Sequence, residues 1–155
     1  MSIKECCNVG VVCCGPDTPL SDVAALMRKH HVGDVVVVEE KNDQRFPLGL
    51  VTDRDIVLET LSVQIDAAVF TAGDIMTSPL ITVREDNGFI ETLRLMRDNK
   101  IRRMPVVNEA GALAGIVTAD DIINLLAMEL SMMTAAIIDQ PVKEGKLRKE
   151  WSGGE

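Results

Sequence analysis

The sequence predicts an α+β protein made of two similar β-α-β-β-α repeats. Two stretches carry this prediction, Gly49–Val57 and Gly115–Ile123, and five of their nine positions hold the same residue. In each stretch an apolar strand leads into a helix. A shift of 69 residues also places Leu26–Arg28 on Leu95–Arg97. An internal repeat of this kind defines the architecture of the chain.

The first repeat contains each expected element in order. Short apolar or β-branched runs predict strands, and apolar residues at helical spacing predict helices. The four consecutive valines suit a strand that is covered on both faces. We expect a strand at Val11–Cys14, a helix at 20–30, a strand at Val35–Val38, a charged loop at Glu39–Arg45, a strand at Phe46–Thr52 and a helix at 53–61.

The second repeat has the same order with three fewer loop residues. Its helix at 88–98 is expected to turn four side chains inward, Phe89, Thr92, Leu93 and Met96. Residues Ile122–Ile138 predict one long, Met-rich helix, and the polar segment Pro141–Glu155, with Trp151, predicts a frayed end. The expected parts are a first repeat at 4–62, a second at 73–130, and an extension with tail at 131–155.

The composition excludes several classes of protein. The chain has 155 residues, 46% of them hydrophobic, and a net charge of −8. This charge argues against nucleic acid, for which a basic face is expected. No uninterrupted run of about 18 apolar residues predicts a membrane span. The first residues lack the apolar core of a signal peptide, so we expect a soluble cytoplasmic protein.

The same polar pair follows the strand in both matching stretches: Thr52 with Asp55, and Thr118 with Asp121. A Thr with a carboxylate three residues later is a common helix cap. The same groups also suit a ligand that carries vicinal hydroxyls and phosphate. Because capping does not require the same solution twice, the repetition weakens the capping interpretation and leaves ligand binding as the alternative.

The four cysteines form two adjacent pairs, Cys6-Cys7 and Cys13-Cys14. Their spacing is not that of a structural zinc site. We therefore expect reduced, structural cysteines, with a thiol-based metal or redox sensor as the alternative. Cys14 is expected to face the core, and Cys13 a cleft.

Together these residues resemble the CBS domain, named after cystathionine β-synthase. The resemblance rests on Ile101–Val107, on Gly115–Ile122 and on the lead-in Asp74–Thr77, and it covers about residues 4–130 as a tandem pair. It implies two halves packed with pseudo-twofold symmetry, a further dimerisation, and clefts that bind AMP, ADP, ATP or S-adenosylmethionine, with AMP or ATP expected first.

The resemblance also implies roles for individual residues. In the second-repeat cleft Thr118 and Asp121 would hold ribose, and Arg102 or Arg103 would meet phosphate. The base pocket would be lined by Thr82, Ile101 and Met104, beside the backbone around Pro105. In the first-repeat cleft the candidates are Thr52, Asp55, Cys13, Val32 and Asp34.

The first repeat departs from the pattern. Gly33-Asp34 replaces Arg102-Arg103, and Asp34 would repel phosphate. Cys13 stands where the second repeat has Thr82. His30, His31 or Arg54 would have to supply positive charge, although histidines at a helix end are usually solvated. We therefore expect the second-repeat cleft to be the better site.

The function that follows is a non-enzymatic regulatory module, which binds an adenosyl ligand, dimerises and acts on a separate, unknown protein. No cofactor or metal is required by this hypothesis. A ligand-free interaction module that uses the Met-rich helix is a further alternative. An enzyme is the weakest hypothesis, because no catalytic motif is present.

Overall fold

The computed structural model of the chain describes the backbone of residues 2–151 and the side chains of residues 2–138. Both repeats have the predicted order. The first comprises β1 (Cys13–Cys14), α1 (Leu20–His30), β2 (Asp34–Lys41), β3 (Gln44–Thr52) and α2 (Asp53–Glu59). The second comprises β4 (Val83–Arg84), α4 (Phe89–Asn99), β5 (Arg103–Val107), β6 (Leu113–Thr118) and α5 (Ala119–Trp151). Short helices cover Ile3–Glu5, Leu61–Val63 and Ala67–Val69, and α3 covers Ala72–Ile75.

Each repeat has its own three-stranded sheet. In the first sheet β1 runs parallel to β2, and β2 pairs with β3 in the antiparallel sense. The second sheet repeats this arrangement with β4, β5 and β6. Both sheets belong to one compact unit, residues 1–119, whereas residues 120–155 form a second unit.

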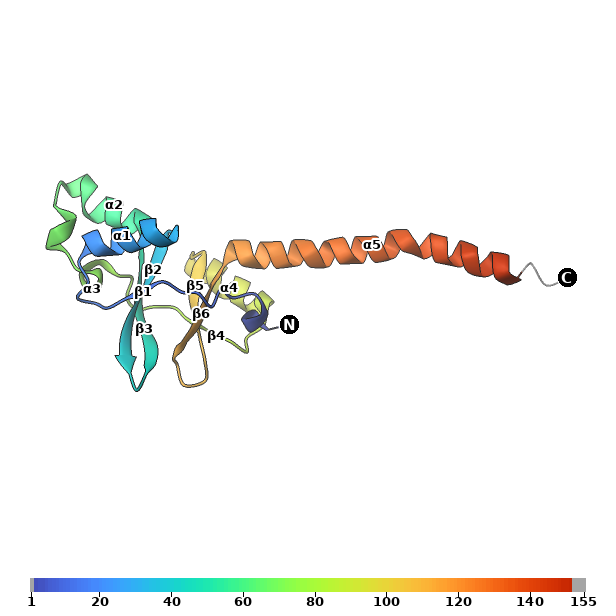
Figure 1. The fold of residues 1–155 in the computed structure, drawn as a ribbon, viewed down its shortest axis with the longest axis horizontal. Coiled ribbons are helices and arrows are strands. Elements are labelled where there is room, and N and C mark those ends of the chain that lie inside the picture. The colour runs from blue at the N-terminus through green and yellow to red at the C-terminus, as the bar shows by residue number, and fades with distance from the viewer. Residues whose placement is uncertain (1, 152–155) are drawn as a thin grey trace. The chain divides into compact units, whose positions relative to one another are not determined.

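The valines of β2 are covered on both faces, as predicted. Val35 and Val37 pack in the core of the first repeat with three buried residues of α1, Leu20, Val23 and Met27. Val36 and Val38 project from the other face, because side chains alternate along a strand. There they form a cluster with Leu50, and Leu80, Leu113 and Ile116 of the second repeat pack against it. This cluster joins the two sheets, whose hairpins lie side by side in Figure 1.

The segment before each repeat packs against the other repeat. Asn8 pairs with Ile116 of β6, and Thr77 pairs with Leu50 of β3. Two glycines make room for these crossings. A Cβ atom on Gly49 would lie 2.5 Å from the Met76 Sδ atom, and one on Gly115 would lie 2.9 Å from the Asn8 carbonyl oxygen. The glycine in each strand–helix motif is therefore needed for the lead-in segment of the other repeat to cross the strand.

The helix at 20–30 has the predicted bounds, but two expected features are wrong. Glu39–Arg45 is not a charged loop, because β2 and β3 continue to a two-residue turn at Asn42 and Asp43. Both turn residues have positive φ, 52° and 59°, as tight hairpins require and as Asn and Asp tolerate. The first strand is also shorter than expected, since only Cys13 and Cys14 pair with β2.

The C-terminal unit is largely one helix. The backbone is helical from Ala119 to Trp151, so the frayed end expected from Pro141 onward is wrong as far as Trp151. Most residues between Val142 and Trp151 are good helix formers, which accounts for this continuation. Residues 152–155, and the side chain of Trp151, lie outside the described part.

The first 20 residues of this helix meet a membrane-span criterion. The segment Ala119–Ile138 has a mean hydropathy of 1.6 and is 6% buried. The segment is not an uninterrupted apolar run, because Asp120, Asp121 and Glu129 fall within it, and the sequence therefore did not predict it as a membrane span. Length and composition alone are weak evidence for a membrane span.

Candidate functional site

A cavity of about 350 Å³ opens between the two repeats within residues 1–119. The first repeat contributes the end of β3 and the start of α2, and the second contributes its lead-in and the loop between α4 and β5. The lining residues are Leu50, Thr52, Arg54, Asp55, Thr77, Pro79, Leu80, Ile81, Lys100, Ile101, Arg102 and Arg103. Apolar surface exceeds polar surface in the lining, as is usual for ligand sites.

Thr52 and Asp55 are fixed on the first-repeat side of the cavity by a capping box. The Thr52 hydroxyl accepts a hydrogen bond from the Asp55 backbone N–H at 3.1 Å, and Asp55 Oδ2 accepts one from the Thr52 N–H at 2.9 Å. The capping interpretation is therefore confirmed for this copy. The same two side chains also line the cavity, so capping and ligand binding do not exclude each other here.

Four cationic side chains line the cavity, Arg54, Lys100, Arg102 and Arg103. The chain as a whole carries a net charge of −8, so this concentration of positive charge is local. Lys100 is placed by the end of α4, where its backbone has a φ of 55° and its N–H donates to the carbonyl oxygens of Arg97 and Met96. Asp55 is the single acidic residue of the described lining. The cavity therefore favours an anionic ligand.

An ion pair connects the repeats beside the cavity. Arg103 Nη1 lies 3.2 Å from Asp34 Oδ1, and the two side chains are 36% and 15% exposed. Asp34 and Arg103 are the first residues of β2 and β5, and they pair with Thr52 and Thr118 of the neighbouring strands. They thus occupy equivalent positions in the two repeats. The ion pair therefore links two residues that the pseudo-twofold symmetry relates to each other.

The grouping of the predicted site residues differs from expectation. The cavity joins Ile101, Arg102 and Arg103 to Thr52 and Asp55, not to Thr118 and Asp121. The strand–helix motif of the first repeat thus faces the loop between α4 and β5 of the second repeat, and the Arg103–Asp34 ion pair joins the two repeats beside it. Asp121 belongs to the second compact unit, and its ribose-binding role stays a prediction.

Several other candidates do not line this cavity. Met104 and Pro105 are buried in the second sheet, so the expected contact of Met104 with a base is not available here. Thr82, Val32 and Cys13 are half-buried outside the lining. His30 and His31 are exposed, as expected of histidines at a helix end.

Sequence reasoning missed several lining residues. They are Lys100, together with Leu50, Thr77, Pro79, Leu80 and Ile81. Most belong to the segment 77–81 before β4, which repeats no residue pair of the strand–helix motifs. The sequence did offer one indication of the lining: Leu80 and Ile81 are apolar and immediately precede Thr82, which was a predicted residue of the base pocket.

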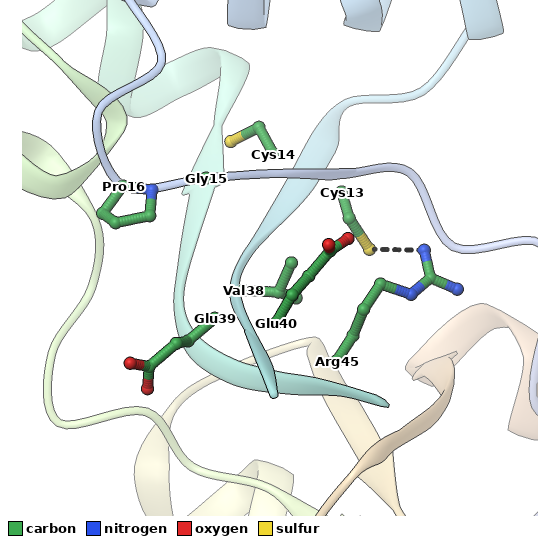
Figure 2. Close-up of a pocket in the computed structure, with 8 residues that line it drawn as sticks. All are labelled: Cys13, Cys14, Gly15, Pro16, Val38, Glu39, Glu40 and Arg45. Atoms are coloured by element: carbon green, nitrogen blue, oxygen red, sulfur yellow. Dashed lines mark hydrogen bonds between the residues drawn. The ribbon is translucent and has the colours of Figure 1, made fainter. Parts of the chain in front are cut away.

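Cys13 lies at a separate cavity of about 470 Å³ along β2 and β3 (Figure 2). The side chains of Cys13 and Cys14 point in opposite directions in Figure 2, as neighbours on a strand do. Arg45 Nη1 donates a hydrogen bond to Cys13 Sγ at 3.5 Å. Burial raises the pKa of the Cys13 thiol, and the positive charge of Arg45 offsets part of this rise. Cys13 is therefore mostly a neutral thiol near pH 7.

The four cysteines do not gather in one place. Cys14 is buried in the core of the first repeat, as predicted, at the position of buried Val83 in the second. Cys7 instead lies against Gly115 of the second repeat. None of the four forms a disulfide bond, and the described residues contain no group of three or more His, Cys, Asp or Glu placed to hold a metal ion.

The CBS domain family model matches residues 3–61 and 72–128, so the chain belongs to the CBS domain family. It is a tandem CBS pair with the pseudo-symmetric α+β fold that the repeats predicted.

Two relatives illustrate the similarity to known proteins. The chain is 38% identical over 125 residues to the uncharacterized protein MK0525 of Methanopyrus kandleri, covering 81% of this chain and 62% of that protein. It therefore spans less than two thirds of that relative's length. It is 34% identical over 119 residues to hypoxic response protein 1 of Mycobacterium tuberculosis, covering 77% of this chain and 80% of that protein.

Solved structures show the same fold. Hypoxic response protein I, crystallised with two coordinated zinc ions, is 31% identical with a TM-score of 0.67, over 80% of this chain and 98% of that chain. The CBS pair of protein MJ0100, in complex with 5′-methylthioadenosine and S-adenosylmethionine, is 24% identical with a TM-score of 0.70, over 81% and 99%. The hexameric CBS-CP12 protein of bloom-forming cyanobacteria is 26% identical with a TM-score of 0.70, over 79% and 66%.

Proposed function

We propose that this CBS pair is a non-enzymatic, cytoplasmic regulatory module that binds an adenine nucleotide between its repeats and signals to a separate protein. The observation that carries the proposal is the composition of the cavity. The Thr52–Asp55 pair stands on one side, four cationic side chains are present, and apolar residues fill much of the rest. The MJ0100 pair supports it, since that protein holds adenosyl ligands on the same fold.

The chemistry of each group suits a part of a nucleotide. The Asp55 carboxylate has a second oxygen, Oδ1, that can accept hydrogen bonds from vicinal ribose hydroxyls. Arg102 and Arg103 offer planar, forked donors to phosphate, and Lys100 and Arg54 add positive charge. Leu50, Leu80, Ile81 and Ile101 provide apolar surface for a base. AMP and ATP both present these three parts.

The test is titration calorimetry on protein that has been unfolded, washed free of ligand and refolded. AMP, ADP, ATP and S-adenosylmethionine are the probes. We expect heat with at least one adenine nucleotide, and about tenfold weaker binding for Asp55→Asn, because a charge-assisted hydrogen bond to ribose becomes a neutral one. Absence of heat with all four probes on the wild-type protein would contradict the proposal.

A matched control is available in the same chain. Thr71 and Asp74 form a capping box like that of Thr52 and Asp55, with the Thr71 N–H donating to Asp74 Oδ2 at 2.8 Å. Asp74 does not line the cavity. Asp74→Asn therefore makes the same change to a helix cap, and it should leave nucleotide affinity unchanged. Equal losses for both variants would assign the effect to helix stability.

We further propose that the chain forms a homo-oligomer, a dimer at least, through α5. Five exposed apolar side chains of α5 follow each other at alternating spacings of three and four residues: Ile123, Leu126, Leu130, Met133 and Ile137. This is the heptad spacing of a helix that pairs with another helix. The CBS-CP12 relative is itself a hexamer.

Light scattering of variants tests the assembly. Leu130→Asp places a charge within the five-residue stripe and should lower the molar mass towards that of a monomer. Ala135→Asp makes the same charge change on an exposed residue outside the stripe, and should leave the mass unchanged. A monomeric wild-type protein would contradict the proposal, and so would an unaltered mass for Leu130→Asp.

A further inference from the structure

Arg103 lies between two possible anionic partners. Arg103 is a lining residue of the cavity between the repeats, and its guanidinium forms the ion pair with Asp34 of the other repeat. A Cβ atom on Gly33 would lie 3.7 Å from Arg103 Nη1, so the guanidinium reaches the start of β2. A phosphate that is bound by Arg103 must therefore share this side chain with Asp34, or displace it.

Within the described part of the chain, the Asp34 carboxylate has no second hydrogen-bond or ion-pair partner that could take the place of Arg103. Its Oδ2 atom is buried and has no hydrogen-bond partner among the described residues. The other carboxylate oxygen, Oδ1, contacts Arg103 Nη1 at 3.2 Å. A partly buried carboxylate that loses its cation is left with uncompensated charge, which is costly. Displacement by phosphate therefore carries a penalty that is set by Asp34.

We propose that Asp34 is an internal counter-ion that competes with ligand phosphate for Arg103, so that binding of a phosphate-bearing ligand breaks the ion pair between the repeats. The inference rests on the proposed function and adds a specificity determinant and a mechanical consequence. Asp34 lowers the affinity for phosphate-bearing ligands and leaves that for an uncharged nucleoside unaffected. Loss of the Asp34–Arg103 ion pair is the change in the contact between the repeats that accompanies ligand binding.

The symmetry of the fold supports this role. Asp34 and Arg103 occupy equivalent positions in the two repeats. If both positions held arginine, two like charges would meet across the repeats. The Asp–Arg combination removes this repulsion. It also places a negative charge beside Thr52 in the first repeat and a positive charge beside Thr118 in the second. Asp34 thus acts through Arg103, as a positioning residue.

The test compares ATP with adenosine, which has the same base and ribose and no phosphate. Asp34→Asn keeps the size of the side chain and removes its charge. We expect ATP to bind this variant about three- to tenfold more tightly than the wild type, the range for loss of a partly exposed ion pair. Adenosine affinity should not change. A merely structural role of Asp34 would alter the two ligands alike.

Two further variants complete the experiment. Asp86→Asn changes the net charge equally and removes the partner of another arginine, Arg84, away from the cavity. It should change ATP affinity less than twofold. Arg103→Gln should weaken ATP binding and abolish the effect of Asp34→Asn in the double variant. Should Asp34→Asn fail to fold, Arg103→Gln still decides, because unaltered ATP affinity in that variant overturns the inference.

The outcomes separate the two proposals. If the wild type binds ATP and Asp34→Asn binds it equally or more weakly, the counter-ion inference is overturned while the proposed function stands. The same holds if adenosine affinity rises together with ATP affinity. If no nucleotide binds the wild type or any variant, the proposed function is overturned, and the inference with it.

Discussion

The two repeats share one fold but differ in what they bring to the space between them. The first repeat contributes the polar Thr52–Asp55 pair, and the second contributes most of the positive charge through Lys100, Arg102 and Arg103. Neither repeat supplies both halves of this cavity. A duplicated sequence can therefore form a site with unlike sides, because the pseudo-symmetry places different surfaces of the two copies against each other.

The largest expected effect concerns the crossings of the lead-in segments. Gly49→Ala and Gly115→Ala should each destabilise the protein by about 1–3 kcal/mol, the usual cost of overpacking. Replacing Met76 with Ala should partly rescue Gly49→Ala, since two of the three closest atoms belong to the Met76 side chain beyond its Cβ. Urea unfolding measures each free energy.

The rescue should fail in the other repeat. Cys7→Ala removes the sulfur that lies 2.9 Å from a Gly115 Cβ, but the Asn8 carbonyl oxygen stays at the same distance. This backbone atom is held by the pairing of Asn8 with Ile116. Equal rescue of both glycine variants would show that the two crossings are more alike than their closest atoms indicate.

The next effect compares the two strand–helix motifs. Asp55→Asn should lower nucleotide affinity about tenfold at the described cavity, as a charge-assisted hydrogen bond becomes a neutral one. Asp121→Asn should leave that site unchanged, because Asp121 is not part of its lining. Calorimetric stoichiometry checks this: a second site that depends on Asp121 would appear as a second ligand per chain and would disappear in Asp121→Asn.

A smaller effect concerns the first strands, where Cys13 and Cys14 replace Thr82 and Val83. The raised pKa of Cys13 means less thiolate at a given pH, so its alkylation at pH 7–8 should be several-fold slower than that of a free cysteine. Arg45→Gln should slow it further, since the positive charge favours the thiolate. The rate is measured on protein in which Cys13 is the single cysteine, with Cys14→Val, Cys6→Ile and Cys7→Met taken from the second repeat. A rate equal to that of a free cysteine would contradict this assignment.

The smallest effect concerns equivalent buried positions on α1 and α4. Val23 and Thr92 are both fully buried, and the Thr92 hydroxyl donates to the Gly88 carbonyl oxygen at 2.9 Å. Thr92→Val should change the free energy of unfolding by less than about 1 kcal/mol, because the lost hydrogen bond is offset by apolar burial. Thermal unfolding of Thr92→Val measures this change. Val23→Thr, the reverse substitution at the equivalent position, is measured in the same way for comparison. A loss of several kcal/mol would show that the hydroxyl has a second role.

The sequence by itself determined the repeat, the order of its elements and the two faces of the valine strand, because these follow from local periodicity and from identical residues at matching places. It also indicated Thr52, Asp55, Ile101, Arg102 and Arg103 as site residues. The hydrogen-bonding, apolar or cationic character of these side chains is known from the residue type alone.

Only the tertiary structure decided which of these residues meet. Packing between the two repeats places Ile101–Arg103 beside Thr52 and Asp55, brings Leu80 and Lys100 into the lining, and pairs Asp34 with Arg103. The buried position of Met104 also follows from packing of the second sheet. The physical reason is that contacts between repeats depend on how two surfaces fit together, and sequence periodicity within one repeat carries no information about that fit.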